Sequence, residues 1–367
     1  MADSRGFVRI MDWRELGQCE GQFPGTQTLF GKHAFCCGGK IYLGHRMKDQ
    51  FERVIDYLRV SVTDRCNERC LYCMPKGYKG WAEKADHLTA DEIVKVVETA
   101  TSLGFRKFRL TGGEPLVRRD IIEIAERMWN LPGVQTLGLS TNGVMLKDLA
   151  KPLKEAGVRS VNISLDAMDP DIYRKLTGGK WEAAMEGIGA AAAAVFEVVK
   201  LNCVMLRGMN DDQIVPLARF GAAMGMPVRF IELMPLAPGG PLDAKQFFSV
   251  SEAMTLLREH DDLRPAHDVR PGHGPARYYQ YGSGFVGFIG SVTCADFCTN
   301  CNKLRLTSDG KLRPCLGRHG EIDLMPALRN EEPSIRHAFE QAIFNKPENH
   351  TFNDGFQVQR PMTAIGG

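Results

Sequence analysis

The sequence lacks any long apolar run and carries almost no net charge, and each absence excludes a class of protein. No stretch approaches the roughly 20 apolar residues that are needed to cross a bilayer. The formal charge over 367 residues is only +2, which predicts no strong attraction to nucleic acid or to an acidic membrane surface. We therefore expect neither a nucleic acid nor a membrane among the partners.

The first 50 residues lack the features of a targeting segment. They contain no apolar signal-peptide core, and acidic residues there disfavour an organellar transit peptide. These are Asp3, Asp12, Glu15 and Glu20. The segment also shows no hydrophobic period. We expect residues 1–50 to be an N-terminal extension of unknown role, and the protein to be cytoplasmic.

Cysteine usage does not suggest a disulfide framework. The count of eleven is odd, and close-spaced groups favour metal or cluster binding in a reducing compartment. The first group, Cys66, Cys70 and Cys73, has the spacing C-x3-C-x2-C. Three thiolates can hold three irons of a [4Fe–4S] cube and leave the fourth iron open. A structural zinc site would need a fourth protein ligand.

A second group, Cys298, Cys301 and Cys315, has the spacing C-x2-C-x13-C and again offers three ligands. Cys294 lies four residues ahead and could close this site as zinc or as a saturated cluster. That alternative remains open. The thiols of the extension have no partner at ligand spacing, so they are either a third metal site or ordinary buried thiols. They are Cys19, Cys36 and Cys37.

From residue 57 onward, short β-rich runs alternate with helical patterns. The expected strands span 57–62, 107–110, 136–140, 160–165, 198–204 and 228–233. Helices are expected between them, the first opened by a capping box from Thr89 to Glu92. The others span 120–130, 146–156, 181–196 and 211–224. Six repeats predict an α/β fold, an incomplete (β/α)6 TIM-type barrel, with a doubly wound open sheet as the alternative.

After residue 236 the pattern changes. We therefore expect a partial barrel over 51–236 and a C-terminal cluster-binding region over 237–367. That region carries a helical pattern at 251–259, a β-like stretch at 277–289 and the second cysteine group.

Two further motifs follow or form predicted strands. Thr111-Gly-Gly-Glu114-Pro follows the second strand, where Gly113 permits a close backbone approach and Glu114 can accept a bond from an amine. An ordinary turn is the alternative. Lys303 and Arg305 alternate with leucines, so a strand would present both cations on one face. That face is either solvated or contacts a phosphate or base.

The first cysteine group, with Tyr72 before its last cysteine, resembles the defining motif of the radical S-adenosylmethionine (SAM) superfamily. The resemblance implies that SAM chelates the open iron and is cleaved to a 5′-deoxyadenosyl radical. It also implies that the segment containing Gly113 and Glu114 is the site of the SAM amine.

A more specific resemblance extends over residues 51–367. The run from Leu58 to Cys66, the block from Phe297 to Thr307 and the final Gly366-Gly367 together resemble the GTP 3′,8-cyclase family of molybdenum-cofactor biosynthesis. The resemblance implies two [4Fe–4S] clusters and SAM. The radical would remove the C3′ hydrogen of GTP, leading to (8S)-3′,8-cyclo-7,8-dihydroguanosine 5′-triphosphate.

The same resemblance implies a role for each matching residue. The cluster ligands would be Cys66, Cys70, Cys73, Cys298, Cys301 and Cys315. The SAM contacts would be Tyr72, Gly113, Glu114, Ser164 and Met234. The GTP contacts would be Arg59, Arg109, Ser140, Lys200, Lys303 and Arg305. Arg59, Gly366 and Gly367 would serve catalysis, the glycines from a tail that reaches into the active site.

Simpler roles are available for some of these residues. Ser164 and Met234 could pack at strand ends, and Arg109 could be an ion-pair partner. Two positions depart from the family: Lys303 replaces the usual Arg, and Ser140 replaces a frequent Thr.

The resemblance also implies partners. These are GTP, a flavodoxin- or ferredoxin-like electron donor and a downstream cyclic pyranopterin synthase. A homodimer is one candidate assembly. Two other functions remain as alternatives: another twin-cluster radical SAM enzyme, such as one that modifies a peptide, and a zinc-binding regulatory module.

Overall fold

The computed structural model of the protein describes residues 34–37, 40–43, 47–74, 87–236, 242, 244–269, 271–329, 334–356 and 359–366. The chain divides into two compact units, Met1–His45 and Arg46–Gly367. In the first unit, β1 (Ala34–Cys37) pairs antiparallel with β2 (Lys40–Leu43). The structure does not describe Cys19 or the side chains of Cys36 and Cys37, so the prediction made for these three thiols lies outside the described part of the chain.

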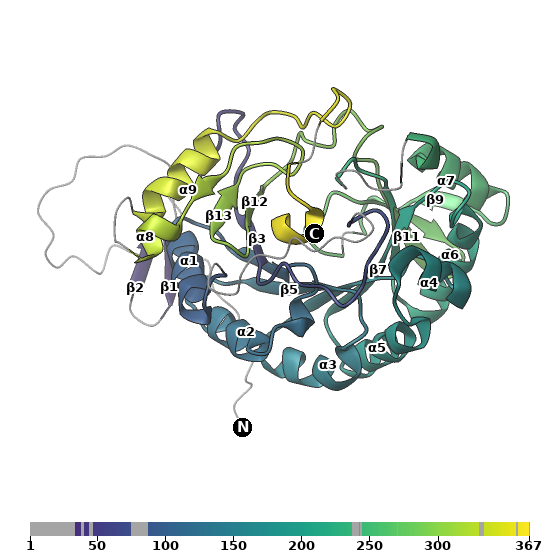
Figure 1. Ribbon diagram of the computed structural model, residues 1–367, viewed down its shortest axis with the longest axis horizontal. Helices are drawn as coiled ribbons and strands as arrows, with labels where there is room; N and C mark the ends of the chain where they lie inside the picture. The colour runs from purple at the N-terminus through teal and green to yellow at the C-terminus, as the bar shows by residue number, and fades with distance from the viewer. Residues whose placement is uncertain are drawn as a thin grey trace, which may run out of the picture. The chain divides into compact units, whose positions relative to one another are not determined.

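A twelve-stranded sheet organises the second unit (Figure 1). Six of its strands lie side by side in chain order, each parallel to the next. They are β3 (Tyr57–Ser61), β4 (Lys107–Thr111), β5 (Thr136–Thr141), β6 (Ser160–Ser164), β7 (Val198–Met205) and β8 (Val228–Glu232). These are the six strands expected from the sequence.

The C-terminal region adds strands to both sides of this group. β12 (Lys303–Leu306) pairs parallel with β3, and β11 (Gly284–Ile289) pairs parallel with β8. Short antiparallel strands then form the two edges. They are β13 (Lys311–Arg313), β14 (Ile322–Asp323), β10 (Arg277–Tyr281) and β9 (Leu263–Pro265). The strands at the two ends do not pair with each other, so the predicted incomplete barrel is confirmed.

Helices cover the outer face of the curved sheet (Figure 1). The five expected ones are α1 (Ala90–Ser102), α2 (Ile121–Trp129), α3 (Leu146–Glu155), α5 (Trp181–Ala193) and α6 (Ile214–Met224). The α1 capping box forms as predicted, with the Glu92 amide donating to Thr89 at 3.2 Å. Gly104 follows α1 with a φ of 95°, in the left-handed region that glycine favours.

One described helix between the expected strands was not predicted. α4 (Pro170–Thr177) begins with an Asp169 cap and ends at Gly178, whose φ is 68°. Both are ordinary start and stop signals. α7 (Val250–Arg258) is the helix expected at 251–259. The remaining helices are α8 (Met325–Arg329), α9 (Ile335–Phe344) and α10 (Met362–Ile365). Short 3-10 helices are η3 (Pro115–Val117), η4 (Asp211–Gln213) and η5 (Ala244–Gln246).

The outer face of the sheet, under the helices, carries apolar side chains, and the inner face carries polar ones. On β3, Leu58 and Val60 are fully buried and belong to the core beneath the helices. Because successive side chains point to opposite faces, Tyr57, Arg59 and Ser61 share the inner face. The inner face therefore presents polar groups to the enclosed side of the sheet.

None of the described helices is long and apolar enough to cross a membrane.

Candidate active site

The first cysteine group lies in the loop that leaves the carboxyl end of β3. The three thiols are free, and their charges act on one another. Burial raises the pKa of Cys66 and of Cys73 to about 12, and raises that of Cys70 well above its usual value. A buried thiolate is therefore unfavourable here without a compensating positive charge.

The glycine pair after β4 packs directly on this cysteine loop. The Gly113 amide donates to the Thr63 carbonyl at 2.8 Å, and the Glu114 amide donates to the Arg65 carbonyl at 2.8 Å. A Cβ on Gly113 would lie 2.4 Å from the Arg65 carbonyl oxygen. Glycine is thus required for close packing of the two loops, whatever ligand they hold.

Glu114 connects this loop to the end of β5. Its carboxylate is 1% exposed and accepts bonds from the Leu116 amide at 3.0 Å, the Thr141 hydroxyl at 2.8 Å and the Asn142 amide at 2.7 Å. Burial raises its pKa to about 7 despite these donors. Whether Glu114 also binds a SAM amine stays a prediction.

Two buried acids that were not predicted from the sequence, Glu68 within the cysteine loop and Asp166 after β6, bond this loop to other elements. Tyr72 donates to Asp166 at 2.6 Å, and Asp166 also accepts the Val204 amide at 2.9 Å. Tyr173 of α4 donates to Glu68 at 2.8 Å. Burial raises the pKa of Glu68 to about 7 and that of Asp166 to about 6. The position of Glu68 between two motif cysteines was the available signal.

Cations from several strands gather on the inner face of the sheet. They are Arg59 (β3), Arg109 (β4), Lys200 (β7), Arg229 (β8), Lys303 and Arg305 (both β12). Arg305 aligns with Arg59, and Arg59 aligns with Arg109. The sequence analysis selected all of them except Arg229.

Burial and neighbouring positive charges lower the pKa of several of these cations. Burial first, and then Arg305, lowers the pKa of Arg59 to about 9. Burial, followed by Arg229 and Arg109, lowers that of Lys200 to about 6. Burial also lowers the pKa of Arg305 to about 10. Collecting charges of one sign in a buried site is unfavourable unless something negative binds there.

Their partners are largely neutral. Arg109 donates to the Tyr57 hydroxyl at 2.8 Å and the Leu139 carbonyl at 2.5 Å, and Lys200 donates to the Pro271 carbonyl. Arg229 donates to the Asn202 amide oxygen at 2.8 Å. Among the described residues, no carboxylate forms an ion pair with these three or with Arg305, so the simpler ion-pair role for Arg109 has no support there.

The other predicted contact residues lie on or just after the same strands. Ser140 is half-buried on β5 and aligns with Asn162, which aligns with Lys200. Ser164 ends β6, and Met234 follows β8. Both are half-buried, and nothing about them separates a ligand contact from strand-end packing.

The second cysteine group surrounds the start of β12. Its three thiols are free and lie within each other's electrostatic influence, and backbone amides of His350 and Gly317 donate to Cys298 and Cys315. Although burial opposes it, Lys346 and Lys303 lower the pKa of Cys301. Cys294 is also a free thiol, and its part as a fourth ligand stays an open alternative.

Lys346, just beyond α9, was not selected from the sequence. Its side chain is deeply buried and donates to the Lys303 and Pro314 carbonyls, each at 2.8 Å. It therefore fixes the backbone close to Cys301 and directly before Cys315.

The C-terminal tail enters the same space, and α10 lies inside the curve of the sheet (Figure 1). Arg305 donates to the Gly366 carbonyl at 2.5 Å. A Cβ on Gly366 would lie 2.8 Å from Ser61 of β3, and the Thr363 amide donates to Cys73. Gly367 lies outside the described residues, so its predicted role stays a prediction.

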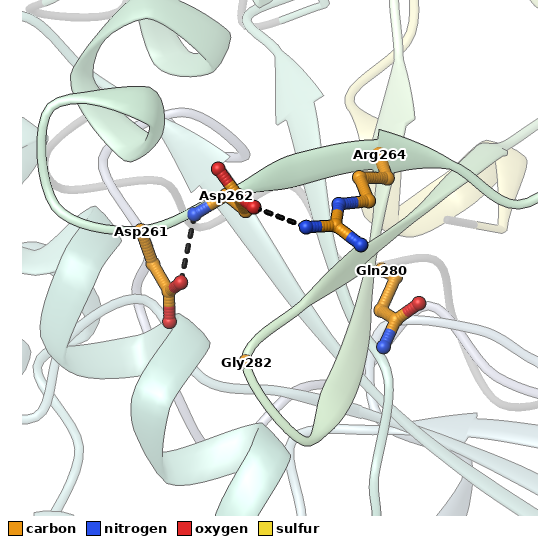
Figure 2. Close-up of a pocket in the computed structure, with 5 residues that line it drawn as sticks. All are labelled: Asp261, Asp262, Arg264, Gln280 and Gly282. Atoms are coloured by element: carbon orange, nitrogen blue, oxygen red, sulfur yellow. Dashed lines mark hydrogen bonds and ion pairs between the residues drawn. The ribbon is translucent and has the colours of Figure 1, made fainter.

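Two surface depressions in the described part lie away from these residues. One, of about 180 Å³, is lined by Asp261, Asp262, Arg264, Gln280 and Gly282 beside β9 and β10 (Figure 2). The other, of about 430 Å³, includes Thr299 and Asn300 on the outer side of the second cysteine loop. Neither contains a residue predicted to bind SAM or GTP.

Both three-cysteine groups have the donors that an iron–sulfur cluster needs. Each offers three free thiols with backbone amides directed at sulfur, and Cys66 accepts the Glu68 amide at 3.4 Å. Among the described side chains, no three His, Cys, Asp or Glu residues surround a common metal position. Ligation of the clusters by these cysteines therefore stays a prediction.

The partial barrel, with a three-cysteine loop after its first strand, defines the radical SAM class of protein. Residues 60–221 match the family model of the radical SAM superfamily, and residues 226–352 match that of Molybdenum Cofactor Synthesis C. Solved structures give the same fold. Native anSMEcpe with bound AdoMet has a TM-score of 0.56 at 14% identity, covering 84% of this chain and 88% of that one.

Streptococcus suis SuiB bound to precursor peptide SuiA also has a TM-score of 0.56, at 13% identity, covering 87% of this chain and 71% of that one. The GTP 3′,8-cyclase of Pelotomaculum thermopropionicum is 43% identical over 327 residues, 88% of this chain and 100% of its own length. That of Alkaliphilus oremlandii is 41% identical over 329 residues, with the same coverage. The chain belongs to the GTP 3′,8-cyclase family, as the sequence predicted.

Proposed function

We propose that this protein converts GTP to (8S)-3′,8-cyclo-7,8-dihydroguanosine 5′-triphosphate, the first step of molybdenum-cofactor biosynthesis. The observation that supports it most is the buried cation group, which lies between two three-cysteine loops and against the C-terminal tail. A nucleoside triphosphate is a compact source of negative charge for such a site.

The cofactors of this family are SAM and two [4Fe–4S] clusters. Cys66, Cys70 and Cys73 would hold one cluster, and the second three-cysteine group, Cys298, Cys301 and Cys315, the other. With SAM bound, the first cluster supplies the electron that cleaves SAM to a 5′-deoxyadenosyl radical. The proposed SAM contacts lie in the first cysteine loop or follow or end strands of the sheet. They are Tyr72 of the loop, Gly113 and Glu114 after β4, Ser164 at the end of β6 and Met234 after β8.

The cations of the inner face are the proposed triphosphate contacts. Arg59, Arg109 and Arg305 form one row across three adjacent strands, and their guanidinium groups can each bind two phosphate oxygens. Lys200, Lys303 and Arg229 add charge from neighbouring strands. Ser140 would contribute a hydroxyl between them. Lys303 supplies a point charge where an Arg would offer a planar fork.

Arg59 and the two terminal glycines are proposed to act in catalysis by positioning the nucleotide. Arg59 stands in the centre of the cation row. Gly366 already lies against Ser61 and Thr111 at the carboxyl ends of β3 and β4, where a side chain would collide. A narrow space lined by the tail would also exclude water from a radical reaction.

Partners and location are part of the proposal. The reaction needs GTP and a one-electron donor, for which a flavodoxin- or ferredoxin-like protein is suited. The product would pass to a cyclic pyranopterin synthase. Reduced thiols and iron–sulfur clusters favour the cytoplasm, and a homodimer is the assembly we would test first.

The proposal is tested by anaerobic incubation of the reconstituted enzyme with GTP, SAM and a strong reductant. We expect the cyclised nucleotide by mass spectrometry, together with 5′-deoxyadenosine. SAM cleavage without any cyclised nucleotide would refute the assignment and favour another twin-cluster radical SAM enzyme. A colourless protein that contains zinc would favour the regulatory alternative.

A further inference from the structure

One arginine at the base of the C-terminal tail bonds to two carboxylates of the rest of the unit. Arg360 donates to the Glu321 carboxylate at 2.8 Å through one terminal nitrogen and to the Asp309 carboxylate at 2.8 Å through the other. The three side chains are only 23%, 17% and 19% exposed. The planar fork of arginine suits such a two-carboxylate contact, which lysine cannot reproduce.

Both carboxylates belong to the connections of the antiparallel strands β12, β13 and β14. Asp309 lies in the turn between β12 and β13, and Glu321 directly precedes β14. β12 bears Lys303 and Arg305. The tail is therefore held by the same group of strands that presents two of the proposed substrate cations.

Glu321 also connects the tail to the second cysteine group. Its other oxygen accepts a bond from Arg313 at 2.8 Å. Arg313 in turn donates to the Cys315 carbonyl at 2.9 Å and to the Arg318 carbonyl at 2.7 Å. Arg360, Glu321 and Arg313 thus form one continuous polar path from the tail to the loop of Cys315.

Beyond Arg360 the tail makes few polar contacts with the rest of the unit. The amides of Ala364 and Gly366 bond within the tail, to Pro361 and Met362. The described outward polar contacts are the Arg305 bond to Gly366 and the Thr363 amide bond to Cys73. A helix of four residues has little stability of its own, so its place depends on what anchors it.

We propose that Arg360, clamped by Asp309 and Glu321, is a positioning residue that holds the tail in the barrel. It acts through Gly366 and touches no reacting atom. The catalytic part of this inference rests on the proposed function. The position of the tail inside the barrel, which we call its seating, does not rest on that function and can be measured separately.

Seating is tested by hydrogen exchange of the C-terminal peptide in the reconstituted full chain. In Arg360→Ala, exchange at the Ala364 and Gly366 amides should speed up by about tenfold or more, because the tail leaves its site more often. Lys311→Ala is the matched control. It removes the 3.3 Å ion pair between Lys311 of β13 and Asp323 of β14 but no contact with the tail. Unchanged exchange in Arg360→Ala would overturn the proposal.

Catalytic positioning is tested by steady-state kinetics of the same variants. With both clusters intact by iron count, Arg360→Ala should lower kcat for cyclisation by about tenfold or more and change the KM for GTP little. Asp309→Asn should give a smaller loss of kcat, and combining it with Arg360→Ala should lower kcat little further.

Faster exchange with an unchanged kcat would overturn the positioning role. If the wild-type enzyme makes no cyclised nucleotide, the proposed function fails while the exchange result still decides seating.

Discussion

Lys200 is the residue whose chemistry depends most on a bound anion. Its pKa of about 6, against an ordinary 10.5, results from burial and from Arg229 and Arg109. Near neutral pH the amine is therefore mostly uncharged before substrate binds. A triphosphate would favour the ammonium form, so its binding should raise this pKa and draw in a proton.

This linkage predicts the direction of a pH effect. GTP binds more tightly when Lys200 is protonated. Its affinity should therefore fall as the pH rises above about 6, the pKa of Lys200 in the free protein. The fall should end once the pH exceeds the higher pKa that Lys200 has in the complex with GTP. Calorimetry at about pH 7.5, in buffers of different ionisation enthalpy, should show uptake of up to about one proton. Lys200→Met should abolish that uptake, and exposed Lys151→Met should not. Equal uptake in both variants would contradict this account of Lys200.

Lys346 supports a second prediction at this scale. Replacing it with methionine leaves the buried Lys303 and Pro314 carbonyls without their donor. The free energy of unfolding should fall by about 1–3 kcal/mol for each carbonyl that water cannot reach. Urea denaturation of Lys346→Met, with Lys151→Met as control, measures it. A stability equal to that of the control would show that these bonds contribute little.

Single residues could be predicted where they belong to a motif or where the family resemblance indicates them, as it does for Arg109 and Lys200. The cysteines, Gly113, Glu114, Lys303 and Arg305 lie in recognisable motifs. Glu68, Asp166, Arg229 and Lys346 do not, because an isolated acid or cation has the same appearance in a sequence on a surface as in a site. Their importance comes from burial and from partners on other strands, which only the folded chain brings together.

At the scale of elements, the six strands and five helices were predictable because short β-rich runs alternate with longer helical patterns along the chain. β11 and β12 could not be assigned as flanks of the barrel, since their neighbours β8 and β3 are distant in the sequence. The 277–289 stretch was recognised as β-like, but its division into a hairpin was not. α4 has only 8 residues, which is too short for a clear helical period, although its sequence carries the start and stop signals of a helix.

The packing of the glycine loop on the cysteine loop gives a prediction at this scale. In Gly113→Ala the new Cβ would meet the Arg65 and Asp64 carbonyls at 2.4 and 2.6 Å, so one loop must move. Iron content should fall from about eight to about four per chain as the first cluster is lost.

Gly189→Ala in α5 is the matched control. A Cβ there meets nothing within 4 Å, so this variant should keep its iron and gain roughly 0.5–1 kcal/mol of helix stability. Full iron content in Gly113→Ala would contradict the close-packing argument.

At the scale of the whole molecule, the site is assembled from segments at opposite ends of the sequence. β3 and the first cysteine loop come from its early part, whereas β12, the second cysteine loop and the tail come from its last 70 or so residues. The parallel pairing of β12 with β3 brings them together. The sequence resemblance indicated that the early and late segments form one site, and the pairing of β12 with β3 is the physical reason.

Removing the tail should therefore separate binding from reaction. Deletion of Gly366 and Gly367 leaves both cysteine groups and the cation row intact. We expect iron content and SAM binding to persist while cyclisation falls below detection. Product formation by the truncated enzyme, measured by mass spectrometry, would show that the tail is dispensable.

The central claim is that these segments place the ribose of GTP next to the site where SAM is cleaved. GTP carrying deuterium at C3′ tests this most directly, because the hydrogen removed from substrate ends in 5′-deoxyadenosine. We predict that 5′-deoxyadenosine from the wild-type enzyme carries one deuterium atom and that the nucleotide product has lost it. Unlabelled 5′-deoxyadenosine formed alongside labelled product would contradict the account.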